Sequence, residues 1–308
     1  MTGFADIYEV LDGIELVPSG LPLVAGLTGF TNAGSAVTAI AENIFENFEA
    51  ELIIKFSNDE LLDYRSRRPV MFFDRDHIAE YEPATLGIYL IRDEVGSPFL
   101  YLHGYEPDFR WEAFAEAVTH LVDVFDVSSF TWVHSIPFPA PHSKPIGITV
   151  SGNRQEFIDR YSEWRPQTQV PGNALHLLEY RLAAAGVPTT GYVLLVPHYL
   201  ADSDYPEAAI AGLERLTATT GLVFPTDDLR AAAVDVARKI DEQVEQNADL
   251  AKLVHNLEAG YGKDRLGPDQ TPIAKPEERM PSADEIASDL EDYLASMQRN
   301  RDDKADQD

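Results

Sequence analysis

The sequence predicts an α/β fold with a mainly parallel sheet that helices cover on both faces. The stretch 21–48 reads as a strand, a glycine-containing turn and an amphipathic helix. Further along, short apolar runs that suit buried strands alternate with helical stripes, as in the succession of 99–103, 110–125 and 129–136. Such an alternation is typical of a mainly parallel sheet between two layers of helices.

The unit at 21–48, LPLVAGLTGFTNAGSAVTAIAENIFENF, is the element around which we expect the domain to be built. It begins with an apolar run long enough for one buried strand, and residues 28–30 then turn the chain. Either Thr31 or Asn32 is placed to cap the helix that follows, by accepting hydrogen bonds from its first turn. The small residues at 33–36 predict a close approach of strand, turn and helix.

The other elements before residue 104 follow from clusters of β-branched and apolar residues between turn residues. They are an edge strand or lead-in at 6–17, strands at 51–56, 86–93 and 99–103, a turn at 58–62, a basic loop at 64–69, and an extended segment with a turn at 70–81. In the basic loop, Arg65, Arg67 and Arg68 either form a patch for an anion or partner, or pair with nearby Asp and Glu.

Beyond residue 109, helices and strands alternate. The helix prediction is clearest at 110–125, where the apolar residues recur at three- and four-residue steps. Four prolines in PFPAPHSKP, at 137–145, require a loop, and their rigid rings lower the entropy lost in holding one shape. The predicted elements are helices at 110–125, 172–185 and 206–219, and strands at 129–136, 146–151 and 190–196.

Ligand sites of such sheets lie beyond the carboxyl ends of the parallel strands. If the strands run as predicted, four segments gather at that edge: 29–35, 103–110, 137–145 and 197–205. We therefore look for candidate site residues in these segments.

After the core domain, at 1–226, the sequence predicts a C-terminal helical extension at 227–297. Apolar residues at alternating four- and three-residue steps predict one long helix at 227–261, on the order of 50 Å, with polar residues Gln243 and Asn247 in its seam. This narrow seam suits either helix–helix packing in an oligomer or an ordinary helix lying on its own sheet. We expect a homo-oligomer, with a trimer as one candidate size.

The end of the chain is predicted to be a linker, a last helix and a tail. Gly, Pro and charged residues make 262–281 a linker, and Ser282 with Glu285 forms a capping box that opens a helix at 282–297. Residues 298–308 are expected to be a disordered charged tail.

Composition excludes several classes of function. The 308 residues include 52 acidic and 24 basic side chains, and a net charge of −28 disfavours nucleic-acid and membrane-surface binding. The absence of cysteine excludes disulfides, thiolate metal sites and cysteine nucleophiles. No apolar run approaches the roughly 20 residues of a membrane helix, and the first residues lack a basic n-region, so we expect a cytoplasmic protein.

Five motifs occur in an order that resembles the PAC2 family, over roughly residues 5–300. They are GFTNAGSA at 29–36, PHSKP at 141–145, VPHYL at 196–200, LEAGYG at 257–262 and MPSADEI at 280–286. This family includes bacterial and archaeal relatives of the eukaryotic proteasome assembly chaperone 2, and the long acidic form is similar to its actinobacterial branch. The resemblance implies a phosphorylase/hydrolase-like three-layer α/β/α fold, self-association and, for eukaryotic members, a scaffold role in assembly of the proteasome α-ring.

The candidate ligand-binding site is the turn at 29–35, because a helix N-terminus with small residues offers free N–H groups to a phosphate or carboxylate. Its residues are Gly29, Asn32, Ala33, Gly34 and Ser35, to which the converging loops add His142, Lys144 and His198. Lys144 stands where the PAC2 pattern has Arg, so the charge is kept but the bidentate fork is lost.

No catalytic residue is identified from the sequence. Nucleotide-binding glycine motifs and the GxSxG nucleophile elbow are both absent. His103, His134, His142 and His198 fall at strand ends or in the converging loops, where His142 or His198 suits acid–base work, but no pair has metal-ligand spacing. We expect neither a metal nor a cofactor.

Two functions fit these observations. The first is a non-enzymatic, self-associating scaffold or chaperone-like protein that binds other proteins, with a link to proteasome assembly. The alternative is an enzyme that acts on a nucleoside- or phosphate-bearing small molecule at the turn, since a phosphorylase-like fold would permit it, although fold alone does not establish a reaction.

Overall fold

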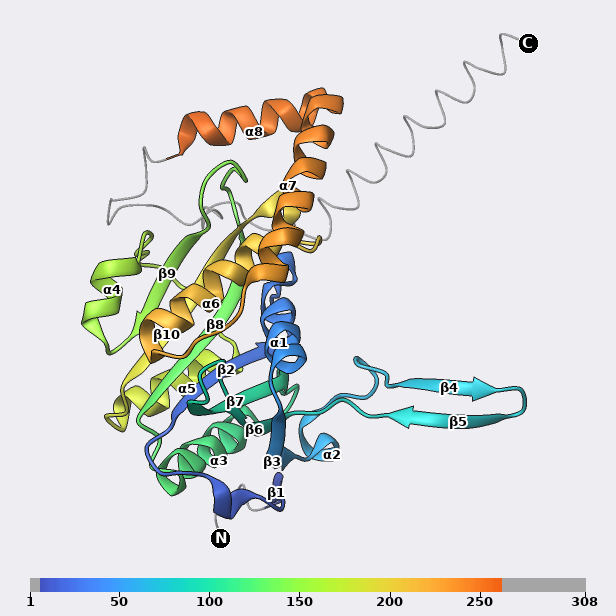
Figure 1. Cartoon of the computed structure of the whole chain (residues 1–308), viewed down its shortest axis with the longest axis vertical. Helices are drawn as coiled ribbons and strands as arrows, with labels where there is room; N and C mark the ends of the chain where they lie inside the picture. Colours follow the sequence, from blue (N-terminus) through green and yellow to red (C-terminus); the bar gives the residue numbers. More distant parts are fainter. Residues whose placement is uncertain (1–5, 262–308) are drawn as a thin grey trace, which may run out of the picture. The chain divides into compact units, whose positions relative to one another are not determined.

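The computed structural model describes residues 6–261, which form a mixed eight-stranded sheet with helices on both faces (Figure 1). The strand order is β1-β3-β6-β7-β2-β8-β10-β9, and β7, β2, β8 and β10 at its centre are parallel neighbours. The bounds are β1 (Tyr8–Val10), β2 (Pro22–Thr28), β3 (Ala50–Phe56), β6 (Gly87–Arg92), β7 (Pro98–Tyr105), β8 (Ser129–Phe138), β9 (Gly147–Gly152) and β10 (Thr189–Pro197). With β3, five of these eight strands run in one direction, so the mainly parallel sheet is confirmed.

Two layers of helices enclose the sheet. On one face lie α3 (Trp111–Val124) and α5 (Ala174–Ala184), and on the other lie α1 (Ala36–Asn47) and α6 (Pro206–Thr220). Each pair shares an apolar cluster with the side chains of the sheet beneath it. The three-layer α/β/α class is therefore confirmed, as are the predicted strands and helices of the core.

The two faces of the sheet are built by the two-residue period of its strands. Along β2, Leu23, Ala25 and Leu27 belong to the apolar cluster of α3 and α5, whereas Val24 belongs to the cluster of α1 and α6. All four side chains are buried, which explains why β2 reads as a continuous apolar run and not as an alternating one.

Some short elements differ from the sequence-based expectation. The predicted turn at 58–62 contains one helical turn, α2 (Asn58–Leu61), and a further helix, α4 (Gln155–Tyr161), follows β9. The extended segment with a turn predicted at 70–81 is confirmed, and it forms a separate two-stranded antiparallel sheet from β4 (Val70–Asp74) and β5 (His77–Glu82).

The prediction of one long helix at 227–261 is wrong. The structure has two helices, α7 (Asp227–Gln246) and α8 (Ala248–Gly260), separated at Asn247, whose φ of −124° and ψ of 103° are extended. The side-chain oxygen of Asn247 accepts hydrogen bonds from the N–H groups of Asp249 and Leu250, at 3.0 and 3.1 Å. Asparagine competes for backbone donors in this way, so the polar seam residue begins a new helix.

Helix α7 packs against helix α6 of its own chain, and helix–helix packing in an oligomer stays a prediction. Its inward side chains join the apolar cluster of α1 and α6, with Ile240 buried in it and Leu229, Val236 and Val244 packed against it. The predicted linker at 262–281, helix at 282–297 and tail at 298–308 lie outside the described residues.

Candidate functional site

The turn at 29–35 lies at the carboxyl end of β2 and passes through one 3-10 turn, η2 (Ala33–Ser35), into α1. The N–H of Gly34 donates to the carbonyl oxygen of Ala201 at 2.8 Å, and the N–H of Tyr205 donates to the carbonyl oxygen of Gly34 at 3.0 Å. Gly34 has a φ of 67°, and a Cβ there would lie 3.1 Å from the Cβ of Tyr205. The predicted close approach is therefore present, and it joins the turn to the segment after β10.

Of the two candidate capping residues, Thr31 and Asn32, it is Asn32 whose side chain accepts a hydrogen bond from the first turn of α1. Its Oδ1 accepts from the N–H of Val37 at 2.9 Å, and its Nδ2 donates to the Thr38 hydroxyl at 2.7 Å. Ser35, which directly precedes α1, has a left-handed φ of 52°. Asn32 thus reaches across the 3-10 turn to supply an acceptor to the first turn of α1.

Glu106, which follows β7, supplies a buried carboxylate beside the turn. One oxygen accepts from the N–H of Phe30 at 3.3 Å, and the other accepts from the N–H of Ala174, the first residue of α5, at 2.8 Å. A Cβ on Gly29 would lie 2.7 Å from the Cβ of Glu106, so this contact requires glycine. Sequence reasoning placed 103–110 near the turn but did not select Glu106.

Two donors of the turn therefore have protein acceptors: Glu106 for the N–H of Phe30, and the carbonyl oxygen of Ala201 for the N–H of Gly34. An anionic ligand at the turn would have to replace these acceptors or bind beside a carboxylate. The ligand-binding role of residues 29–35 stays a prediction that these contacts do not support.

His134 and His176 lie behind the turn, on the face covered by α5. The N–H of Thr31 donates to Nε2 of His134 at 3.4 Å, and the ring centres of the two histidines are 6.3 Å apart. Burial, together with the neighbouring His176, lowers the pKa of His134 to about 4, and burial also lowers the pKa of His176. Both rings are therefore neutral at pH 7, and no group of three or more metal-ligating side chains occurs among residues 6–261.

The three other predicted site residues lie on the segments 137–145 and 197–205, at the same edge of the sheet. His142 contacts the neighbouring segment, since its Nδ1 lies 2.7 Å from the hydroxyl of Tyr199 and its Nε2 lies 3.5 Å from Asp241 of α7. Lys144 and His198 are exposed, and neither side chain has a hydrogen bond or ion pair with the turn within residues 6–261. The structure thus places these loops at one edge of the sheet, and a ligand-binding role of His142, Lys144 and His198 stays a prediction.

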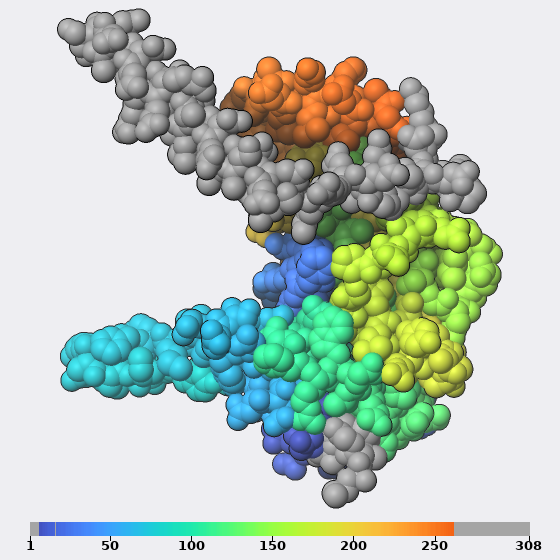
Figure 2. All heavy atoms as spheres, turned by 180° about the vertical axis from the view of Figure 1, so that it is seen from behind, coloured from blue at the N-terminus to red at the C-terminus, as the bar shows by residue number. Residues whose placement is uncertain are grey.

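A second candidate site is the hairpin of β4 and β5, residues 70–82, which we call the arm. Figures 1 and 2 show the arm extending away from the eight-stranded sheet, and in the described part of the chain its strands pair only with each other. A free two-stranded hairpin is at best marginally stable in water. The sequence predicted an extended segment here and assigned it no role.

The register gives the arm two unlike faces. Residues directly opposite each other share a face, and the pairs Met71–Tyr81 and Phe73–Ile78 lie two residues apart along β4. We call these four residues the apolar face of the arm. Their exposed fractions range from 48% to 61%, so each keeps about half of its surface in water. The opposite face carries Val70, Phe72, Asp74, His77, Glu80 and Glu82.

The apolar face had a sequence signal that was not used. VMFFD followed by RDHIAEYE is a strand, a charged turn and a second strand, with aromatic residues that no helix pattern explains. The sequence could not show that the face is uncovered, because apolar strands of this composition are usually buried.

Comparison with known proteins gives a consistent picture. A model described as the PAC2 family matches residues 26–244. A crystal structure of Rv2714 from Mycobacterium tuberculosis, a protein of unknown function, is 40% identical with a TM-score of 0.78 and covers 84% of this chain and 90% of its own. A protein of unknown function from Corynebacterium glutamicum is 33% identical with a TM-score of 0.79, covering 83% of this chain and 97% of its own.

A more distant structure, the proteasome-assembly chaperone homologue Rv2125 from Mycobacterium tuberculosis, is 22% identical with a TM-score of 0.68. It covers 76% of this chain and 100% of its own, and at this identity the likeness shows a shared fold only. No curated protein matches the sequence. Within residues 6–261, no helix is both long and apolar enough to span a membrane.

Proposed function

The chain belongs to the PAC2 family, and from this premise we propose that it is a self-associating scaffold with a chaperone-like role, which binds other proteins and does not transform a small molecule. One structure with this fold is a proteasome-assembly chaperone homologue, which supports a link to proteasome assembly. The observation that carries the proposal is the exposed apolar face of the arm.

The apolar face is large enough to drive association. Fully burying one side chain of this size contributes about 1.5–3 kcal/mol. Covering the exposed half of Met71, Phe73, Ile78 and Tyr81 would therefore contribute on the order of 3–6 kcal/mol before the entropy of association is subtracted. A monomer that left this face in water would forgo that contribution.

We assign the face to a second copy of the same chain. A two-fold contact between identical subunits requires a surface that complements itself, and a face of four apolar side chains meets this condition. The opposite face does not, because Asp74, Glu80 and Glu82 would meet their own counterparts and repel them. Three arms around a threefold axis bury the same face, so a trimer satisfies the proposal as a dimer does.

Adjacent phenylalanines on opposite faces provide a matched test. Phe73 on the apolar face is 61% exposed and Phe72 on the other face is 57% exposed. Light scattering at micromolar concentration should show a multiple of 34.2 kDa for the wild type and for Phe72→Glu, but a monomer for Phe73→Glu. A wild type that is strictly monomeric, or equal behaviour of the two variants, would overturn the proposal. A cooperative thermal unfolding transition in each variant confirms that both variants fold.

The proteasome link needs its own experiment. Purified proteasome α-subunits from the same organism are mixed with the wild type, and sedimentation velocity is used to look for a complex larger than either component. We expect a complex that is absent when an unrelated acidic protein of similar mass replaces the wild type. Its absence would remove the link to the proteasome, whereas self-association is decided by light scattering.

A further inference from the structure

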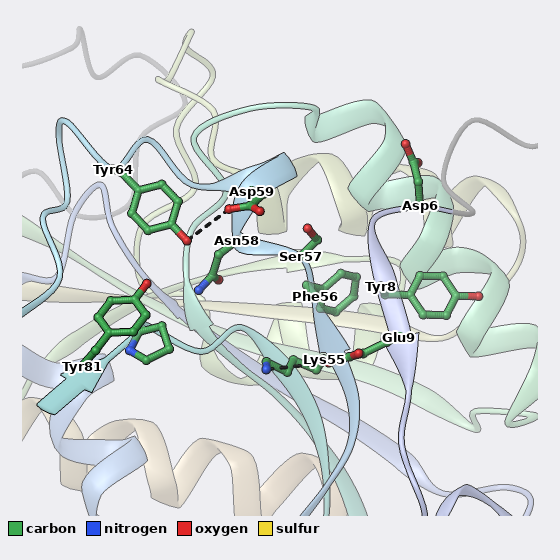
Figure 3. A pocket seen from close by; sticks show the side chains of 11 residues that line it. Asp6, Tyr8, Glu9, Lys55, Phe56, Ser57, Asn58, Asp59, Tyr64 and Tyr81 are labelled. Atoms are coloured by element: carbon green, nitrogen blue, oxygen red, sulfur yellow. Dashed lines mark hydrogen bonds and ion pairs between the residues drawn. The ribbon is translucent and has the colours of Figure 1, made fainter.

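A cavity of about 460 Å³ lies at the base of the arm (Figure 3). Its walls come from the edge strand β1, the end of β3, the short helix α2, and the residues that lead into and out of the arm. The residues that line it are Asp6, Tyr8, Glu9, Lys55, Phe56, Ser57, Asn58, Asp59, Tyr64, Tyr81 and Pro83. None of them belongs to the turn or to the converging loops described above.

Aromatic rings and polar groups meet in one part of this cavity. Figure 3 shows the hydroxyl groups of Tyr64 and Tyr81 directed toward one another, with Asn58 and Asp59 beside them. The hydroxyl of Tyr64 donates to a carboxylate oxygen of Asp59 at 3.4 Å. Tyr81 also belongs to the apolar face of the arm, so the cavity opens next to that face.

Among the described residues that line the cavity, negative charge exceeds positive charge, with three carboxylates and one ammonium group. Asp6 pairs with Arg110 at 3.1 Å, and Glu9 pairs with Lys55 at 3.7 Å. Asp59 has no ion pair within residues 6–261, where its side-chain partner is the neutral Tyr64. Asp59 is thus a carboxylate of the cavity that has no cationic partner in the described part of the chain.

We propose that this cavity binds a cationic side chain, that of Arg or Lys, from a partner protein other than this chain. The hydroxyl oxygens of Tyr64 and Tyr81 can accept hydrogen bonds from a guanidinium or ammonium group, and Asp59 supplies the opposing charge. The site rests on the proposed protein-binding role and names the chemistry of the partner, which is a segment with an exposed basic residue.

Charge supports a foreign partner over a second copy. This chain has a net charge of −28, so a basic partner is attracted to the cavity at long range and another acidic copy of the chain is not. Of the lining residues that the structure describes, Lys55 is the one cation that opposes a bound cation, and Glu9 pairs with it at 3.7 Å. Removal of the Lys55 ammonium group should therefore strengthen the binding of a cation in the cavity.

The test uses acetyl-arginine-amide as the probe, its neutral counterpart acetyl-citrulline-amide, and acetyl-glutamate-amide. Binding is followed by NMR on protein with ring-labelled tyrosine, in which the signals of Tyr64 and Tyr81 are assigned with Tyr→Phe variants. The full-length wild type and the Phe73→Glu variant are both titrated, so that contact between arms cannot hide the cavity.

We expect the arginine probe alone to shift both tyrosine signals in a saturable way. The variant Asp59→Asn should weaken binding by about fivefold, the effect of losing one partly exposed charge pair. Lys55→Met should strengthen it, and Glu80→Gln, which removes an acid on the arm outside the cavity, should leave it unchanged.

Three results would overturn the inference. They are equal binding of the citrulline probe, shifts caused by the glutamate probe alone, and no shift with any probe up to its solubility limit. The scaffold proposal fails separately, through the light-scattering comparison of Phe72→Glu and Phe73→Glu. A monomeric wild type that still binds the arginine probe would therefore refute self-association and keep the cavity.

Discussion

The turn at 29–35 and the arm differ in where their groups find partners. The turn has the features of a ligand site, but Glu106 and the carbonyl oxygen of Ala201, from the same chain, accept hydrogen bonds from the N–H groups of Phe30 and Gly34. The arm has no such features, yet four large apolar side chains on one of its faces stay about half exposed. The region that needs an outside partner is therefore the one with exposed apolar surface, which is the arm. It is not the region with the most groups suited to bind a ligand, which is the turn.

This difference bears on the choice between enzyme and scaffold. An enzyme that binds a phosphate at the turn needs N–H donors that are free before substrate arrives, and the turn has used the donors of Phe30 and Gly34 internally. A scaffold needs an exposed surface that another protein can cover, and the arm has one. If the comparison holds, substitutions at the turn change folding and substitutions on the arm change association.

The largest effect on stability should come from Glu106→Ala. The N–H groups of Phe30 and Ala174 would lose a charged acceptor in a buried place. We expect the free energy of unfolding to fall by about 4 kcal/mol, the sum for two such donors. Urea unfolding measures it, and a loss below about 1 kcal/mol would mean that the carboxylate does not hold the turn together.

Gly34→Val should be nearly as damaging. The new Cβ would lie 3.1 Å from Tyr205 and 3.2 Å from Val196, on a backbone with a φ of 67°. Overpacking and left-handed strain together predict a loss of about 3 kcal/mol. The matched control is Gly221→Val, at a φ of 77° with nothing within 4 Å of its Cβ, where strain alone acts. Equal losses at the two positions would show that the turn is not tightly packed.

Lowering the pH should destabilise the protein through His134. Its pKa is lowered to about 4 in the folded chain, from an ordinary value of 6.5 in the unfolded chain. Below pH 6.5 the unfolded state binds a proton that the folded state does not, so stability is complete above that pH and falls until about pH 4. Between pH 6.5 and 5 the loss should be about 2 kcal/mol.

Urea midpoints of His134→Gln across this pH range test the assignment. The variant should show a flatter pH dependence than the wild type, whereas replacement of the exposed His255 by Gln should leave the slope unchanged. An unchanged slope in His134→Gln would place the pH dependence elsewhere, for instance at His103 or His176, whose pKa values burial also lowers.

Changes on the arm should barely affect the stability of the fold. Phe73→Glu removes a side chain that is 61% exposed on a hairpin whose strands, in the described part, pair only with each other. Measured at concentrations where the wild type is dissociated, the free energy of unfolding should change by less than about 0.5 kcal/mol. A loss of several kcal/mol would show that the arm is packed as part of the core, and the comparison would fail.

The smallest effect is expected from phosphate. Inorganic phosphate or a nucleoside phosphate should produce no saturable rise in melting temperature beyond that of an ionic-strength control, because a ligand stabilises only a state to which it binds. If such a rise appeared and Lys144→Ala abolished it without unfolding the protein, the enzyme alternative would replace the scaffold.

Local order along the chain was predictable from local sequence. The strand before the turn, the cap at Asn32 and the helix after it depend on residues a few positions apart, and all three are present. The single helix predicted at 227–261 failed at Asn247, although the sequence had marked this residue as a polar interruption. The spacing of the apolar residues located the seam of the helix. It could not show whether the helix continues through Asn247 or whether Asn247 caps a new helix.

The site was harder to predict because its contacts are long-range. Glu106 reaches Phe30 across 76 positions and Ala174 across 68, and no local pattern couples these residues. For the arm, the sequence showed the apolar residues themselves. It could not show that these side chains are exposed to water, because exposure depends on the rest of the folded chain.

The sequence by itself determined the order and type of the core elements and the acidic surface, because periodicity, caps and net charge are properties of neighbouring residues or of composition. Only the tertiary structure decided which donors of the turn have acceptors and which face of the arm meets water. Hydrogen-bond satisfaction and burial depend on what the folded chain brings from distant positions, so a motif read alone shows a group's chemistry but not whether that group is free to act.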